Sequence, residues 1–209
     1  MCYDIQTSLF ALFINIISCF TLFLYTPNKQ LKAISLFFLF VGFMQFWDSV
    51  FWTYDASTLI NKYSTKMAMI WNHMEPIILA LLICYYINPL TLPSKIILLI
   101  YTISIIIYSL NGWNKLKGTE ATKDTCGSLY WEWNYMPGTV FVYTIFLICL
   151  IVLSLQFKDW IKWLTIFIII FTFFFSFYKY NINSSIGRFW CYFAAFSPIL
   201  FLCGAIYNN

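Results

Sequence analysis

Residues 67–87 read MAMIWNHMEPIILALLICYYI. The stretch can cross a bilayer, because a spanning helix needs about 20 predominantly apolar residues. It contains an acidic residue, Glu75, followed directly by Pro76. Backbone amides cannot remain unpaired in lipid, so such a crossing must be helical. The stretch therefore predicts a transmembrane helix that carries an ionisable group and a proline able to bend it.

Six further apolar runs resemble this one in length. Of the whole chain, 62% is hydrophobic and 10% is charged, whereas soluble domains are about 45–50% apolar and about 25% charged. We therefore predict an all-α membrane protein, a seven-transmembrane helix bundle that forms a single membrane domain over residues 1–209. The expected helices cover residues 8–25, 33–52, 67–87, 96–113, 138–155, 160–178 and 188–207.

The longest polar stretch, residues 114–137, is the only one large enough to form a small cap over the bundle. It contains the cluster Trp131-Glu132-Trp133. We expect the tryptophans near the ends of the apolar runs, these two included, to lie in the aromatic belts at the membrane interfaces. Glu75-Pro76-Ile77 in the third run and Ser197-Pro198-Ile199 in the seventh also suggest a parallel 3+1+3 repeat.

The orientation in the membrane rests on opposing indications. Lys and Arg divide almost evenly between the two sides, with a slight excess on the side of the amino terminus, which favours that terminus inside. Cys2 and Cys126 lie on this same side and could form a disulfide in an oxidising compartment. Asn183-Ser184-Ser185, also on this side, is a glycosylation sequon. We expect the amino terminus outside, in a lumenal or extracellular space.

Ionisable residues inside a bilayer are costly and point to function. In the second run Gln45 and Asp48 lie three residues apart, and in the third run Asn72 and Glu75 have the same spacing, so each pair shares one helical face. Arg188 enters the seventh run from the same side of the membrane. These five residues form a candidate solute- or proton-binding pocket between helices two, three and seven. Glu75 could exchange a proton there or pair with Arg188, and Asp48 could instead be a hydrated interfacial residue.

Several classes of function are not expected. The chain has one histidine, His73, which we place near the interface, so no multi-histidine metal centre can form. There is no H-E-x-x-H, no G-x-S-x-G and no phosphate-binding glycine loop, so we predict no enzyme, no metal and no cofactor. The basic residues are scattered, which argues against nucleic acid as a partner.

The Met1-Cys2 start, the block from Gln45 to Trp52, the segment from Asn72 to Pro76 and the segment from Gly187 to Cys191 resemble a family of small seven-helix membrane proteins of large DNA viruses and of algae and protists. The resemblance covers nearly the whole chain and implies a seven-helix fold, with no biochemical activity to carry over. It implies an amide before the proline of helix three, whereas this chain has Glu75, so it does not imply a proton carrier there.

The leading hypothesis is a small-solute or ion transporter or permease whose pocket lies in one leaflet. The first alternative is a structural or interaction protein of a viral or organelle membrane, in which the polar residues only hold helices together. The second is a seven-helix sensor or receptor with residues 114–137 as its ligand cap. The lipid bilayer is the one partner common to all three, and the sequence does not decide the oligomeric state.

Overall fold

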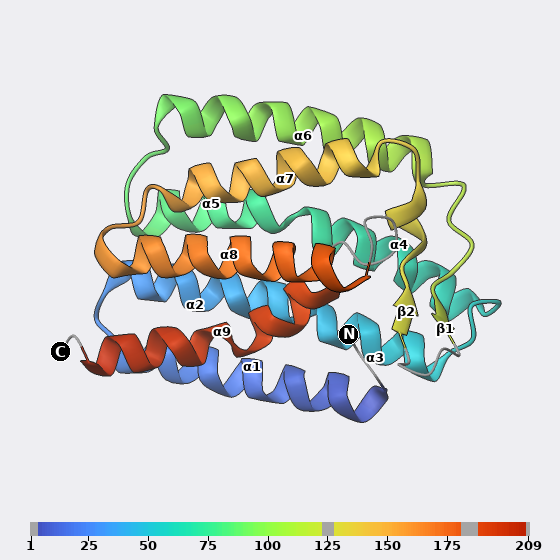
Figure 1. Cartoon of the computed structure of the whole chain (residues 1–209), viewed down its shortest axis with the longest axis horizontal. Coiled ribbons are helices and arrows are strands. Elements are labelled where there is room, and N and C mark those ends of the chain that lie inside the picture. The colour runs from blue at the N-terminus through green and yellow to red at the C-terminus, as the bar shows by residue number, and fades with distance from the viewer. Residues whose placement is uncertain (1–3, 123–127, 181–187, 208–209) are drawn as a thin grey trace.

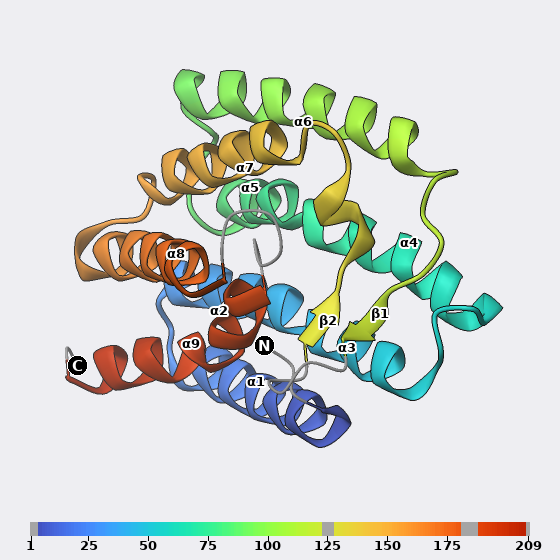
Figure 2. The same cartoon turned by 45° about the vertical axis from the view of Figure 1, so that its right-hand side comes forward.

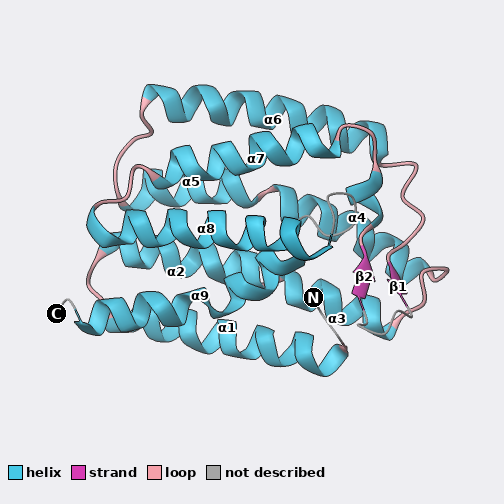
Figure 3. Ribbon diagram, in the orientation of Figure 1, coloured by secondary structure: helices cyan, strands magenta, loops and turns pink. Residues whose placement is uncertain are grey.

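A computed structural model describes residues 4–122, 128–180 and 188–207. Their architecture is almost entirely helical, with one small two-stranded sheet (Figure 3). In chain order the elements are α1 (Ile5–Tyr25), α2 (Lys29–Gly42), α3 (Met44–Thr53), α4 (Leu59–His73), α5 (Glu75–Tyr86), α6 (Leu92–Gly112), β1 (Glu120–Thr122), β2 (Ser128–Tyr130), the 3-10 helix η1 (Glu132–Tyr135), α7 (Thr139–Ser154), α8 (Asp159–Tyr180) and α9 (Arg188–Tyr207).

Two of the predicted helices are each divided in two. The second run is interrupted at Phe43, although α2 and α3 together still make one apolar length of 25 residues. The third run is interrupted at Met74, where α4 and α5 meet at a bend of 45°. Pro76 explains the second interruption, because a proline is tolerated in the first turn of a helix but not in its interior.

The third helix also begins eight residues before its predicted start, at Leu59 rather than Met67. Thr58 caps it by accepting a hydrogen bond from the backbone N–H of Asn61. Three polar residues of this first part, Asn61, Ser64 and Thr65, are buried in the protein. Asn61 donates to the carbonyl of Thr119 at 3.0 Å and accepts from the N–H of Thr119 at 2.8 Å.

The helices lie roughly side by side and the small sheet closes one end (Figure 1). We call this end the hairpin end, and it holds β1, β2, η1, the end of α3 and the beginning of α4. α1 begins at the hairpin end and α9 finishes at the opposite end (Figure 1). α1 packs against α2, α3 and α9, while α7 lies between α6 and α8 and also contacts α5 (Figures 1 and 2).

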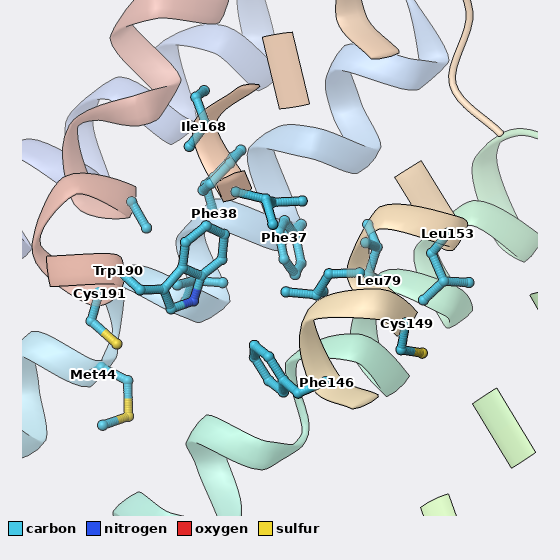
Figure 4. Close-up of a cluster of buried hydrophobic side chains, with 14 of the residues drawn as sticks. Phe37, Phe38, Met44, Leu79, Phe146, Cys149, Leu153, Ile168, Trp190 and Cys191 are labelled. Carbon is cyan, nitrogen blue, oxygen red and sulfur yellow. The ribbon is translucent and has the colours of Figure 1, made fainter. Parts of the chain in front are cut away.

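Aromatic rings fill the centre of the bundle. Phe38 of α2 lies with its ring centroid 6.3 Å from Trp190 of α9, and Trp190 lies 5.6 Å from Phe173 of α8. Phe146 of α7 packs against Phe173 at 5.9 Å. Figure 4 shows Trp190 and Phe146 facing this common core. One buried cluster thus joins α2, α7, α8 and α9.

The outer faces of α1 and α6 are apolar and exposed. Phe10, Phe13 and Phe20 of α1 are each more than half exposed, and so are Leu99 and Ile107 of α6. In the described part of the chain four helical lengths are long and apolar enough to cross a membrane, and the bent pair α4–α5 makes a fifth. These apolar helices are consistent with an integral membrane protein.

Candidate functional site

The break between α4 and α5 places a carboxylic acid inside the bundle. Glu75 is the first residue of α5 and is fully buried. Its Oε2 accepts a hydrogen bond of 2.6 Å from Nε1 of Trp190, which comes from α9. Its Oε1 has no hydrogen-bond partner among the described residues. One carboxyl oxygen therefore ties two helices together, and the other remains available to a proton, a water molecule or a ligand.

A tyrosine from a neighbouring helix bonds the backbone at the break. The hydroxyl of Tyr101 in α6 donates to the carbonyl oxygen of His73 at 2.6 Å. Interrupted helices inside a membrane protein need such donors, because lipid offers none to freed backbone groups. The break is thus held from α6 as well as from α9.

His73 lies in the protein interior, and its place near the membrane interface stays a prediction. It is 2% exposed, and its Nδ1 lies 2.7 Å from the carbonyl oxygen of Met69, so Nδ1 carries the proton. Its ring packs between those of Tyr108 and Tyr143, with centroids at 5.7 and 5.5 Å. The length of the apolar run did not predict this burial of His73 between two tyrosines.

Asn72 connects α4 to α7 and α9. Its Nδ2 donates to the hydroxyl of Tyr143 at 3.0 Å, and Sγ of Cys191 lies 3.9 Å from its Oδ1. The Tyr143 hydroxyl donates to Oδ1 of Asn134 at 2.8 Å and accepts from Nε1 of Trp133 at 3.3 Å. A hydroxyl has one donor and two acceptor positions, so that of Tyr143 is saturated.

Asp48 reaches the same region through the segment that precedes α7. It is 1% exposed and accepts a hydrogen bond of 3.3 Å from Nε1 of Trp131. The Trp131 ring stacks on that of Trp133, with centroids 5.1 Å apart. Asp48 is therefore a buried residue bonded to the hairpin end, so the prediction that it is hydrated is wrong, while its depth in the membrane stays a prediction. Gln45, one turn earlier on α3, is fully buried as well.

We give the name polar cluster to two neighbouring sets of residues. Hydrogen bonds and one ring stack join the first set, which comprises Asp48, Asn72, Trp131, Trp133, Asn134 and Tyr143. The second set is the hydrogen-bonded pair of Glu75 and Trp190, which adjoins the first because Cys191, next to Trp190 on α9, lies against Asn72. Three of its members were predicted, namely Asp48, Asn72 and Glu75. The side chain of Arg188 and the residues Cys2, Cys126 and Asn183 lie outside the described residues.

The sequence did not identify the aromatic members of the cluster. Trp131 and Trp133 were assigned to the aromatic belt, but they are 2% and 0% exposed. Glu132, between them, accepts hydrogen bonds from the backbone N–H groups of Lys117 and Gly118, which folds the segment inward. The alternation of two tryptophans around an acid in a polar loop is the signal that could have suggested this arrangement.

Within residues 4–122, 128–180 and 188–207, no group of three His, Cys, Asp or Glu side chains could hold a metal ion. No protein-family model, no curated protein and no solved structure matches this chain. The resemblance to small seven-helix proteins of large DNA viruses stays a prediction, as does the absence of enzymatic activity.

Proposed function

We propose that the protein crosses its membrane seven times and carries a small solute or an ion through the polar cluster, with Glu75 as the group that binds it. The observation that supports this most is the fully buried Glu75 carboxyl at a helix break, with only one oxygen bonded among the described residues. An acid inside a bilayer is expensive, and transporters place such groups at interrupted helices.

Seven crossings follow if α7 and α8 each span the membrane beside the five lengths identified above. α8 has 22 residues. α7 has 16 residues and is therefore about 24 Å long at 1.5 Å per residue, somewhat short of a 30 Å hydrocarbon core. An odd number of crossings agrees with Figure 1, in which α1 begins at one end of the bundle and α9 finishes at the other. We propose that the hairpin end faces outside.

The polar cluster suits a closed transport intermediate. Asn72 and Glu75 lie on either side of the break and both contact α9, so a change of the bend at Met74 would change their distances from α9. Trp190 and Cys191 meet these two residues from adjacent positions on α9. A ligand that competes with Trp190 for the Glu75 carboxyl would separate α5 from α9 and open a path between them.

Proton and cation flux in proteoliposomes tests the proposal. The native protein is compared with Glu75→Gln, which keeps the shape of the side chain but cannot ionise. Asp159→Asn is the matched control, because Asp159 is an exposed acid at the opposite end of the bundle. We expect flux in the native protein and in the control, and only the leak of protein-free liposomes in Glu75→Gln. Equal flux in all three folded proteins would remove Glu75 from the path.

A second candidate is an interaction protein without transport. The hydroxyl of Tyr143 favours this second function, because its three hydrogen bonds are all made within the protein and leave none for a solute. A polar network of this kind can hold helices together without any transport. This reading predicts no flux in any of the three proteins when all are folded and inserted in both directions. It also predicts that Glu75→Gln keeps the stability of the native protein, since an amide oxygen can accept from Trp190 equally well.

A further inference from the structure

A lateral groove lies between α7 and α8, beside the polar cluster. α7 and α8 are neighbours in the bundle (Figures 1 and 2). The groove has a volume of about 310 Å³. From α7 it is lined by Val140, Thr144, Leu147 and Ile148. Ligand sites commonly begin at about 300 Å³, so the groove can hold part of a small molecule.

The mouth of the groove lies on the outer surface and its floor reaches the interior. Val140 and Phe174 at the mouth are 52% and 67% exposed. Phe173 and Tyr143 at the floor are 3% and 4% exposed. Tyr143 belongs to the polar cluster, and Phe173 packs against Trp190. A molecule in the groove would therefore touch Tyr143, which bonds Asn72, and Phe173, which packs against the partner of Glu75.

A second, more polar hollow adjoins the groove at the hairpin end of α7. It has a volume of about 630 Å³ and is lined by Asn134, Tyr135 and Thr139 among others. Val140 lines both hollows. From Val140 to Ile148 the groove extends about 12 Å along α7 at 1.5 Å per residue. The two hollows thus form one site with a polar end near the interface and an apolar end deeper in.

The chemistry of the lining selects the occupant. Among the described residues that line the two hollows there is no Lys, Arg, Asp or Glu. A membrane lipid has its polar head at the interface and its apolar chain toward the middle of the bilayer, which is the same order as in the two hollows. A soluble anion or cation would find no opposite charge among these described lining residues.

We propose that this site binds one membrane lipid, with its acyl chain in the α7–α8 groove and a head group of zero net charge in the hollow formed by Asn134, Tyr135 and Thr139. The inference rests on the membrane placement proposed above but not on transport. Through Tyr143 and Phe173 the bound chain supports the side of the polar cluster that faces the bilayer.

Photolabelling in lipid nanodiscs tests the site. The probe is phosphatidylcholine with a diazirine on one acyl chain, and labelled peptides are located by mass spectrometry. We expect labelling of α7 and α8 at the groove to exceed labelling of the exposed faces of α1 and α6 several-fold. Phosphatidylglycerol with the same diazirine should label the groove less, because its head group is anionic.

A matched pair of variants makes the test specific. Thr144→Trp places a large ring in the groove mouth, whereas Thr102→Trp places the same ring on α6, which lines neither hollow. Both threonine hydroxyls bond the carbonyl four residues earlier at 2.7 Å, so the two substitutions lose the same local bond. We expect Thr144→Trp to lower groove labelling several-fold and Thr102→Trp to leave it unchanged. Leu147→Trp, deeper in the groove, should act as Thr144→Trp does.

The outcomes separate this inference from the proposed function. Uniform labelling of α1, α6 and the groove would overturn the lipid site, whatever the flux through Glu75. Preference for phosphatidylglycerol would also overturn it as stated. Groove labelling that Thr144→Trp removes, in a protein with no flux, would leave the lipid site standing and reject transport.

Discussion

Pro76 and Pro198 follow a polar residue and precede an isoleucine, yet the helices around them differ. At Pro76 the helix is interrupted and bent by 45°, while Pro198 lies inside the continuous helix α9. In both cases a side chain from another helix bonds the carbonyl three residues earlier. Tyr101 bonds the carbonyl of His73, and Asn15 of α1 bonds the carbonyl of Ala195 at 3.2 Å.

The difference lies in the residue before each proline. Glu75 reaches across to α9 and accepts from Trp190. Ser197 stays within its own helix and donates to the carbonyl oxygen of Phe193 at 3.0 Å. The residue before the proline thus makes an interhelical connection at Pro76 and a purely local bond at Pro198. A proline weakens the hydrogen bonding of its helix. The contacts of the residue before it decide whether that position is also connected to another helix.

The largest expected effect on stability is at the support of Pro198. Asn15 donates to the carbonyl of Phe38 as well as to that of Ala195, so it joins α1, α2 and α9. Asn15→Leu removes both hydrogen bonds and should lower the free energy of unfolding by about 1–3 kcal/mol. Unfolding in detergent by titration with dodecyl sulfate measures this.

Ser18→Ala is the control for Asn15→Leu. Ser18 lies on the same helix and its hydroxyl bonds only carbonyls of α1, at 2.7 Å to Ile14 and 3.2 Å to Asn15. We expect a loss below about 0.5 kcal/mol. A loss for Ser18→Ala equal to that for Asn15→Leu would mean that α1 is sensitive to any polar deletion, and that Asn15 has no special place at the Pro198 turn.

A smaller effect is expected at the support of the Pro76 break. Tyr101→Phe removes a single hydrogen bond, to the carbonyl of His73, and should cost about 1 kcal/mol. Tyr85→Phe is the control, because Tyr85 is 81% exposed. The same unfolding titration compares them. If Tyr101→Phe were as stable as the native protein, the break would be held from α9 alone.

Much of the helical architecture follows from the sequence. Apolar length predicts helices wherever lipid surrounds the chain, and Pro76 predicts where one of them is interrupted. Residues three apart on one helix share a face, which predicted that Asn72 and Glu75 both face the last helix, and both contact α9. The seven-span topology and the 3+1+3 repeat stay predictions. At both prolines the carbonyl three residues earlier accepts a hydrogen bond from a side chain of another helix.

The partners across helices could not be predicted. Trp190 and Glu75 are separated by 115 residues, and no local spacing relates them. Trp131 lies near the end of an apolar run, so its position along the chain suggests an interface. It becomes buried because its segment folds back over α3 and α4 to reach Asp48. Such pairings depend on how the helices pack, which one sequence does not contain.

The smallest effect on stability is expected at Ser197, the residue before Pro198. Ser197→Ala removes a hydroxyl that bonds only Phe193 in its own helix, and should change the free energy of unfolding by less than about 0.5 kcal/mol. Asn15 still bonds Ala195 in this variant, so the turn before Pro198 keeps its support from α1. The unfolding titration would contradict this if Ser197→Ala cost as much as Asn15→Leu. Such a result would mean that Ser197, like Glu75, contributes to contacts between helices, and that the residues before the two prolines have the same role.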